Sequence, residues 1–297
     1  LVNNMNTKKI NNLIFFYSFS GLLILFSNFH IRDIFIFFFF NLMVYLFLYS
    51  KVYYKKLFIP ISLILSVIFG IIFFYLRTEY IVLPVLVFIS FLLEKPIFKF
   101  INSTNKVIPA LSLLFICIIL ILFIVNTQIF DLLKSGYDGY LSSNENVQSL
   151  NNSQSLATIL IINQPLFFRY LLGLVYFIFN PIPFWSGLFS GSYYLFLKSL
   201  HVIMMYFLVP VFYLQMLKKS FFSRNLLSLF IIFFIGYSSI VVTSLELRHL
   251  GTFLGLFFIL VSDFDFKANK KIYKKTLNFF LLTIFLVHLL WITIKFF

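Results

Sequence analysis

The sequence has one cysteine, Cys117, among its 297 residues, and this residue lies within an apolar run. A single cysteine permits neither an intramolecular disulfide nor a metal–thiolate cluster. The chain also lacks a P-loop, a Gly-x-Ser-x-Gly sequence and a His-Glu-x-x-His sequence. The sequence therefore predicts no metal site and no cofactor. We expect Cys117 to be a small buried hydrophobic residue.

Charged residues are scarce, at 11% of the chain, whereas 62% of the residues are hydrophobic and the mean hydropathy is +1.03. A soluble domain of this size needs more polar surface, and the apolar residues here form long blocks, so the expected solvent is a bilayer. The 46 Phe residues and the frequent Ile, Asn and Lys indicate an AT-rich, bacterial genome.

The apolar runs predict an all-α, polytopic integral membrane protein that forms a single membrane domain over residues 1–297. A helix of about 20 apolar residues crosses the hydrocarbon layer. Nine candidate spans, of which the fourth and eighth are short, occupy residues 12–29, 34–50, 57–76, 80–93, 107–126, 193–217, 226–244, 247–262 and 276–296. Residues 127–192 form the one long connection between them.

The distribution of Lys and Arg predicts the orientation, because these residues are concentrated in cytoplasmic loops. With the N-terminus inside, the inner segments carry 16 of the 23 basic residues. The C-terminus and the long loop then lie outside. The net charge of +14 thus mainly reflects the topology, and attraction to anionic lipid headgroups adds to the retention of these residues inside. We expect no nucleic-acid partner.

The long external loop begins with a polar stretch, 127–164, that contains Asp138. Pro165 suits the first turn of a helix, and Pro181 and Pro183 would end it. The resulting amphipathic helix, 165–179, is about 22 Å long, which is short for a span. We therefore expect an interfacial or re-entrant helix at the outer surface. A loop of this length is more often functional than a plain linker.

Several ionisable residues fall at the outer rim on this topology. Glu246, Arg248 and His249 lie at the turn between the seventh and eighth spans, and Lys198 lies three residues before His201 in the outer half of the sixth. Ionisable residues embedded in apolar sequence indicate function by default. Lys198 also has a structural alternative, because lysine can snorkel to the interface. Two neighbouring pairs, Arg32 with Asp33 and Arg77 with Glu79, are expected to be local ion pairs or headgroup contacts.

A cationic pocket under a long external loop suits a lipid-linked diphosphate. The planar fork of an arginine binds phosphate and diphosphate groups. Arg169 and Arg248 are the candidates for this contact, and the aromatic rings of Tyr170 and Trp185 suit the headgroup level and the stacking of sugars. Glu246 or His249 either accepts a proton from the acceptor hydroxyl or only orients Arg248.

Two stretches resemble a known family. RYLLGLVYFIFNPIPFW, from Arg169 to Trp185, and the later ELRHLGTFLGLFFIL are similar to segments of bacterial polysaccharide polymerases of the Wzy-like and EpsG-like type. These are multi-span proteins with one large external loop. The resemblance implies that Arg169 and Arg248 hold a lipid-diphosphate sugar, with His249 assisting.

The combined prediction is a polymerase of polyprenyl-diphosphate-linked oligosaccharide repeat units, which would form an O-antigen, capsule or exopolysaccharide. Catalysis is assigned to Arg248, His249 and Glu246, and substrate binding to Arg169, Lys198, Tyr170, Trp185 and Asp138. The expected location is the bacterial cytoplasmic membrane, with a flippase and a chain-length regulator as partners. The alternatives are another membrane glycosyltransferase or ligase that uses the same donors, and a flippase or transporter.

Overall fold

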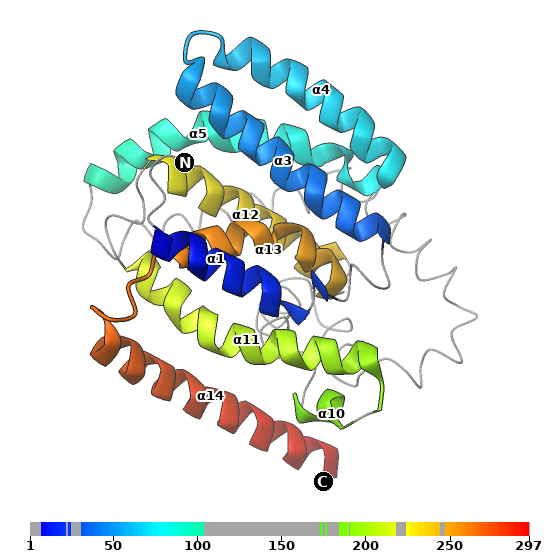
Figure 1. Cartoon of the computed structure of the whole chain (residues 1–297), viewed down its shortest axis with the longest axis vertical. Coiled ribbons are helices and arrows are strands. Elements are labelled where there is room, and N and C mark those ends of the chain that lie inside the picture. The colour runs from blue at the N-terminus through cyan, green and yellow to red at the C-terminus, as the bar shows by residue number, and fades with distance from the viewer. Residues whose placement is uncertain are drawn as a thin grey trace.

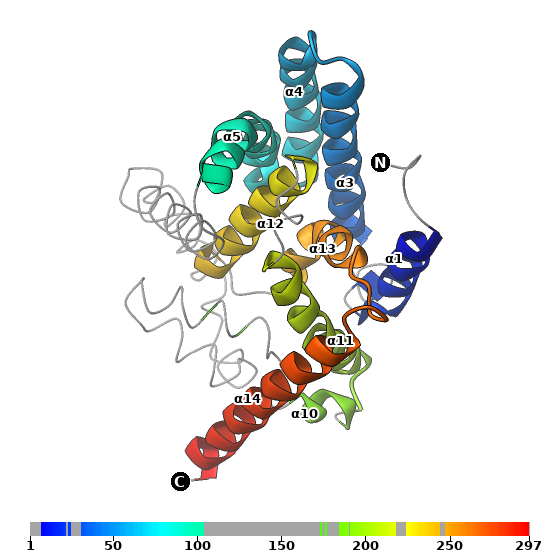
Figure 2. The same cartoon turned by 90° about the vertical axis from the view of Figure 1, so that its left-hand side faces the viewer.

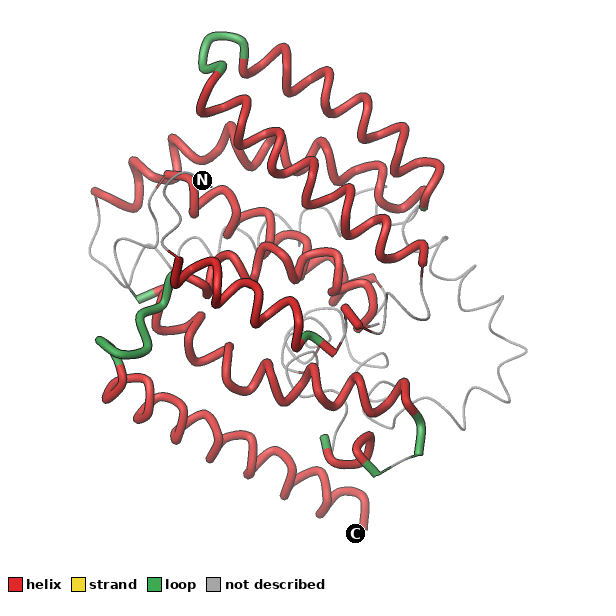
Figure 3. Tube along the Cα trace, in the orientation of Figure 1, coloured by secondary structure: helices red, strands yellow, loops and turns green. Residues whose placement is uncertain are grey.

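The computed structural model describes residues 7–21, 23–24, 31–103, 173, 176, 184–189, 191–217, 224–243 and 247–296. The elements in this part of the chain are helices, without a strand among them (Figure 3). They are α1 (Thr7–Phe19), α3 (Ile31–Tyr53), α4 (Phe58–Leu76), the 3₁₀-helix η2 (Thr78–Val82), α5 (Leu83–Ser103), α10 (Trp185–Leu188), α11 (Tyr193–Met216), α12 (Arg224–Thr243), α13 (Leu247–Ser262) and α14 (Lys270–Phe296) (Figure 1). The predicted all-α class is confirmed for these residues.

Four of the helices are long and apolar enough to cross a membrane. The qualifying segments are Arg32–Tyr53, Phe58–Leu76, Tyr193–Met216 and Lys270–Leu290, and two shorter apolar helices cover Leu226–Ser238 and His249–Ser262. The chain is therefore a helical membrane protein. The predicted span 107–126 and the predicted interfacial helix 165–179 lie outside the described residues.

Large apolar side chains cover the outer faces of α4 and α14. Ile64 and Val67 of α4, and Phe279 and Phe285 of α14, are each at least 60% exposed. Contiguous apolar surface of this kind is rare on soluble monomers, since each Å² left in water costs about 25 cal/mol. Lipid is the solvent that suits these two faces.

Helix α13 lies at the centre of the bundle, where it packs against α12, α3, α1 and α11 (Figures 1 and 2). Phenylalanine rings fill the contacts: Phe253 lies 5.0 Å from Phe40 of α3, and Phe257 lies 5.5 Å from Phe233 of α12, between ring centroids. Gly255 lets α3 approach, because a Cβ at this position would overlap the side chain of Asn41. Although α13 is short, it is buried on nearly every side, and this burial stabilises it.

Contacts between helix termini define one end of the bundle. Lys9 of α1 pairs with Asp263, just after α13, at 2.5 Å, and Lys51 near the end of α3 pairs with Glu94 of α5. We call this the lysine end. It carries ten described lysine side chains, namely Lys9, Lys51, Lys55, Lys56, Lys95, Lys267, Lys270, Lys271, Lys274 and Lys275.

The opposite end is defined in the same way. Asp33 at the start of α3 lies 3.7 Å from Arg77, which follows α4, and the backbone N–H of Phe184, next to α10, donates to His288 near the end of α14. We call this the α10 end. Consecutive long helices therefore run back and forth between two ends, as an alternating set of spans requires.

Several helices extend beyond the predicted spans, and α3 and α5 do so at their C-terminal ends, past a charged residue. α5 continues past the predicted limit at 93 to Ser103, and α3 continues past 50 to include Lys51. The predicted spans end just before these charges, but Lys51 and Glu94 neutralise each other across the two helices, so both helices continue past them. Lys51, one of the basic residues expected on the inner side, therefore lies within the last turn of α3.

Candidate functional site

The connection between α10 and α11 is a close turn that depends on two glycines. A Cβ at Gly187 would overlap the Oγ of Ser199 and the carbonyl oxygen of Leu195, so only glycine lets α10 lie this close to α11. Gly191 has a φ of +69°, a left-handed conformation that glycine adopts without strain. This turn sets how α10 lies against the start of α11.

A hollow of about 260 Å³ opens at this turn. It is lined by Gly187, Leu188, Gly191, Ser192, Tyr193 and Phe196. Tyr193, which lines the hollow, is 51% exposed, and Trp185 of the adjoining helix α10 is 36% exposed. Aromatic rings at a small, mainly apolar hollow can stack on a sugar face, while the backbone groups of the turn supply hydrogen bonds.

Lys198 brings a positive charge to the same end. Its Nζ lies 4.3 Å from the centroid of the Tyr194 ring, one turn earlier in α11. Helical side chains lean toward the helix N-terminus, so the ammonium is carried toward the α10 end rather than into the bundle. A cation held over a ring face in this way is attracted by the ring quadrupole and stays available to an anion on its other side.

Below Lys198, the interior of α11 carries polar atoms that are buried. His201 is fully buried, and neither ring nitrogen has a hydrogen-bond partner among the described residues. The same holds for the Oγ of Ser199. Buried polar atoms usually have a hydrogen-bond partner, so Ser199 and His201 are two exceptions within the described part of α11.

Helix α14 closes the site from the side through His288. The Nε2 of His288 accepts a hydrogen bond from the N–H of Phe184 at 3.4 Å, and its Nδ1 lies 2.8 Å from the carbonyl oxygen of Ile284. The indole of Trp185 lies 5.2 Å from the imidazole, at an interplanar angle of 32°. His288 thus holds Trp185 against α14.

The structure places four of the predicted site residues at the α10 end. Trp185 and Lys198 belong to the adjoining elements α10 and α11, while Arg248 and His249 lie in the first turn of α13, opposite to the end that carries Asp263. His249 is half-buried. The remaining predicted site residues, Glu246, Arg169, Tyr170 and Asp138, lie outside the described residues.

One of the two pairs expected at this end differs from the structure, and the other, Arg77 with Glu79, involves a side chain outside the described residues. Asp33 faces Arg77 across α3 and α4 rather than its neighbour Arg32, which is exposed. The antiparallel packing of α3 against α4 places the start of one helix beside the end of the other. Arg77 also lies 5.9 Å from the ring centroid of Tyr80. The Asp33–Arg77 pair and the Tyr80 ring thus connect α3, α4 and η2, so we assign them a structural role.

A buried carboxylate lies at the lysine end, and it was not predicted from the sequence. Glu94 is 1% exposed and accepts hydrogen bonds from Lys51 and, at 2.5 Å, from Ser228 of α12. Lys51 also lies 5.2 Å from the ring centroid of Phe91. The one available signal was a glutamate inside an apolar run, FLLEKPIF, at a position where a loop was expected.

Within the described residues, no group of three or more His, Cys, Asp or Glu side chains has the arrangement of a metal site. Comparison of the chain with protein-family models, with curated protein sequences and with solved structures found no match.

Proposed function

We propose that this protein polymerises polyprenyl-diphosphate-linked oligosaccharide repeat units into a surface polysaccharide at the outer face of the bacterial cytoplasmic membrane. The proposal rests on the group of side chains at the α10 end. There a lysine, two exposed aromatic side chains and a hollow of about 260 Å³ gather at the terminus of a helix long enough to cross a membrane. A lipid-linked sugar diphosphate matches this surface in three ways. Its lipid suits the apolar helix, its diphosphate suits the lysine, and its sugars suit the aromatic side chains and the hollow.

The proposed orientation follows from the lysine end. Ten described lysines gather there, and positively charged segments are retained in the cytoplasm. The N-terminus then lies inside, and the α10 end and the C-terminus lie outside. A flippase that delivers the repeat unit and a chain-length regulator are the partners that such a reaction implies.

In the proposed complex, the polyprenyl tail lies along the apolar helices and the diphosphate contacts Lys198, together with Arg248 and Arg169. Trp185 and Tyr193 stack on the sugars. The acceptor hydroxyl oxygen forms a bond to the anomeric carbon of the donor, and the bond from that carbon to the diphosphate oxygen breaks. The acceptor proton passes to His249 or Glu246, and the cations stabilise the departing diphosphate.

Deletion of the gene tests this function. We expect single repeat units to remain on the lipid carrier, as seen by gel electrophoresis of the extracted lipid-linked sugars. Polymer of normal length in the deletion strain would refute the proposal. Polymer of normal length that stays unattached to its final acceptor would instead identify a ligase.

Substitution of Lys198 tests the site. Loss of a charged hydrogen-bond partner costs about 1.5–3 kcal/mol, so the Lys198→Met variant should polymerise about ten- to a hundredfold more slowly in membranes supplied with the lipid-linked unit. Lys198→Arg should retain much of the rate. The matched control is Lys270→Met, at the lysine end, which should behave as wild type. Equal rates for the two methionine variants would remove Lys198 from the site.

A further inference from the structure

The turn between α3 and α4 lies at the lysine end and consists of residues 54–57. The N–H of Tyr54 donates to the carbonyl of Ser50 at 2.8 Å, and the N–H of Leu57 donates to the carbonyl of Tyr54 at 2.9 Å. Both flanking helices are long and apolar enough to cross a membrane. A connection this short between two spans has to lie at the level of the lipid headgroups.

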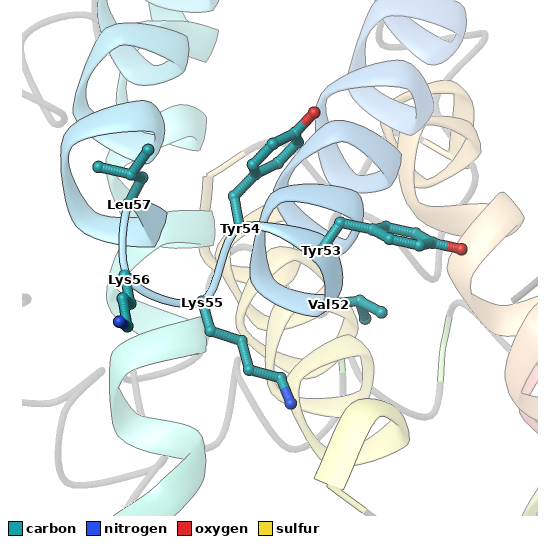
Figure 4. A pocket seen from close by; sticks show the side chains of 6 residues that line it. All are labelled: Val52, Tyr53, Tyr54, Lys55, Lys56 and Leu57. Carbon is teal, nitrogen blue, oxygen red and sulfur yellow. The ribbon is translucent and has the colours of Figure 1, made fainter.

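A hollow of about 460 Å³ opens at this turn (Figure 4). Its lining residues are all exposed, and they are Val52, Tyr53, Tyr54, Lys55, Lys56 and Leu57. Figure 4 shows the side chains of Lys55 and Lys56 pointing to the same side of the turn. None of the lining residues is acidic, so the hollow is positively charged.

Two acidic side chains at the lysine end pair with other lysines, and a third, Asp265, accepts hydrogen bonds from the backbone N–H groups of Lys267 and Ala268. Glu94 accepts hydrogen bonds from Lys51 and Ser228, and Asp263 pairs with Lys9 at 2.5 Å. In the part of the chain that the structure describes, Lys55 and Lys56 take part in no ion pair. Two adjacent ammonium groups at headgroup level therefore lack a neutralising carboxylate and attract an anion.

A row of exposed tyrosines leads from this hollow along α3 toward the middle of the membrane. Tyr45, Tyr49 and Tyr53 are spaced four residues apart and are 47%, 40% and 60% exposed. Their ring centroids are 6.1 Å apart for Tyr45–Tyr49 and 4.5 Å apart for Tyr49–Tyr53. Eight residues of helix cover about 12 Å, so the row extends from the headgroups into the upper acyl layer. Each tyrosine adds a hydroxyl donor to an apolar surface.

From these features, we propose that the hollow and the tyrosine row together bind one anionic glycerophospholipid. The headgroup phosphate lies on Lys55 and Lys56, the ester carbonyls accept hydrogen bonds from tyrosine hydroxyls, and an acyl chain lies along the ring faces. A free phosphate would use the lysines but would leave the tyrosine row without a role. This site lies at the opposite end of the bundle from the proposed reaction and does not depend on it.

Native mass spectrometry of the purified full chain tests the site, with phosphatidylglycerol and phosphatidylcholine as probes. We expect phosphatidylglycerol to bind wild type at least tenfold more tightly than phosphatidylcholine. The Lys55→Gln/Lys56→Gln variant should bind phosphatidylglycerol about thirtyfold more weakly, because each lysine near an anionic lipid surface contributes roughly a fivefold factor. The matched control is Lys274→Gln/Lys275→Gln, which removes two exposed lysines from α14 at the same end.

Two further arms separate the possible sources of phosphate. Tyr53→Ala should weaken phosphatidylglycerol binding, whereas Tyr213→Ala, an equally accessible tyrosine on α11, should not. Excess inorganic phosphate should leave the bound lipid in place. The proposal is overturned if the Lys55/Lys56 and Lys274/Lys275 variants bind phosphatidylglycerol equally, or if inorganic phosphate displaces the lipid. All the substituted side chains are exposed, and unchanged thermal unfolding of each variant confirms that its fold is intact.

Discussion

At the scale of single residues, the carboxylate of Glu94 has the strongest structural consequence. It is buried at the lysine end between Lys51 of α3 and Ser228 of α12. Three helices that are distant in the sequence meet at this one side chain. An unpaired charge in such a position is costly, whereas a hydrogen-bonded pair is tolerated.

The Glu94→Ala variant should therefore lose stability. Lys51 is only 19% exposed and would keep its charge without a partner, so we expect the free energy of unfolding to fall by about 3–5 kcal/mol. Adding Lys51→Met should restore most of the loss. Thermal unfolding in detergent micelles measures both effects, with Lys95→Ala as the exposed control. A Glu94→Ala variant as stable as that control would show that the pair is not structural.

Substitution of His201 should raise the stability, unlike substitution of Glu94. Its imidazole is fully buried, and its nitrogens have no partner among the described residues. An unsatisfied buried polar group costs about 1–3 kcal/mol, so His201→Leu should raise the free energy of unfolding by a similar amount. The same micelle assay measures this change. A lower stability for His201→Leu would mean that the imidazole makes a hydrogen bond essential to the fold.

At the scale of helices, the apolar runs predicted several elements closely. The predicted 57–76, 193–217 and 247–262 correspond to α4 (Phe58–Leu76), α11 (Tyr193–Met216) and α13 (Leu247–Ser262). These runs end at polar residues or turns, so their limits are local properties of the sequence. The far end of α5 could not be predicted in this way, because the burial of Glu94 depends on α3 and α12.

The candidate site also has features that the sequence predicts and features that depend on packing. The alternation of spans predicted that Trp185, Lys198, Arg248 and His249 share one end of the bundle, and the structure places them there. The close approach of α10 to α11 was not predictable. It depends on the contact of Gly187 with Ser199, which follows from packing in three dimensions.

Two helical glycines offer a matched test of the packing. A Cβ at Gly255 would overlap Asn41 and lie 2.9 Å from the hydroxyl of Tyr17, whereas a Cβ at Gly70 meets nothing within 4 Å. Gly255→Ala should destabilise the protein by about 1–3 kcal/mol through overpacking. Gly70→Ala should stabilise it by up to about 1 kcal/mol through helix propensity. Equal effects at the two positions would contradict the central placement of α13.

At the scale of the whole molecule, the lysines form a strongly polarised distribution. Ten described lysines lie at one end. At the α10 end, the lysine and arginine side chains that the structure describes are Arg32, Arg77 and Lys198. Membrane insertion retains the more basic end in the cytoplasm. If this rule sets the orientation, as we propose, the anionic-lipid site lies inside and the polymerase site lies outside.

Labelling of single cysteines in intact cells tests this arrangement most directly. In a Cys117→Ser background, Lys56→Cys reports the lysine end and Tyr193→Cys reports the α10 end, and both positions are exposed. We predict that a membrane-impermeant maleimide labels the Tyr193→Cys variant in intact cells, and the Lys56→Cys variant only after the membrane is permeabilised. Labelling of Lys56→Cys in intact cells, with Tyr193→Cys protected until permeabilisation, would contradict both the orientation and the external site.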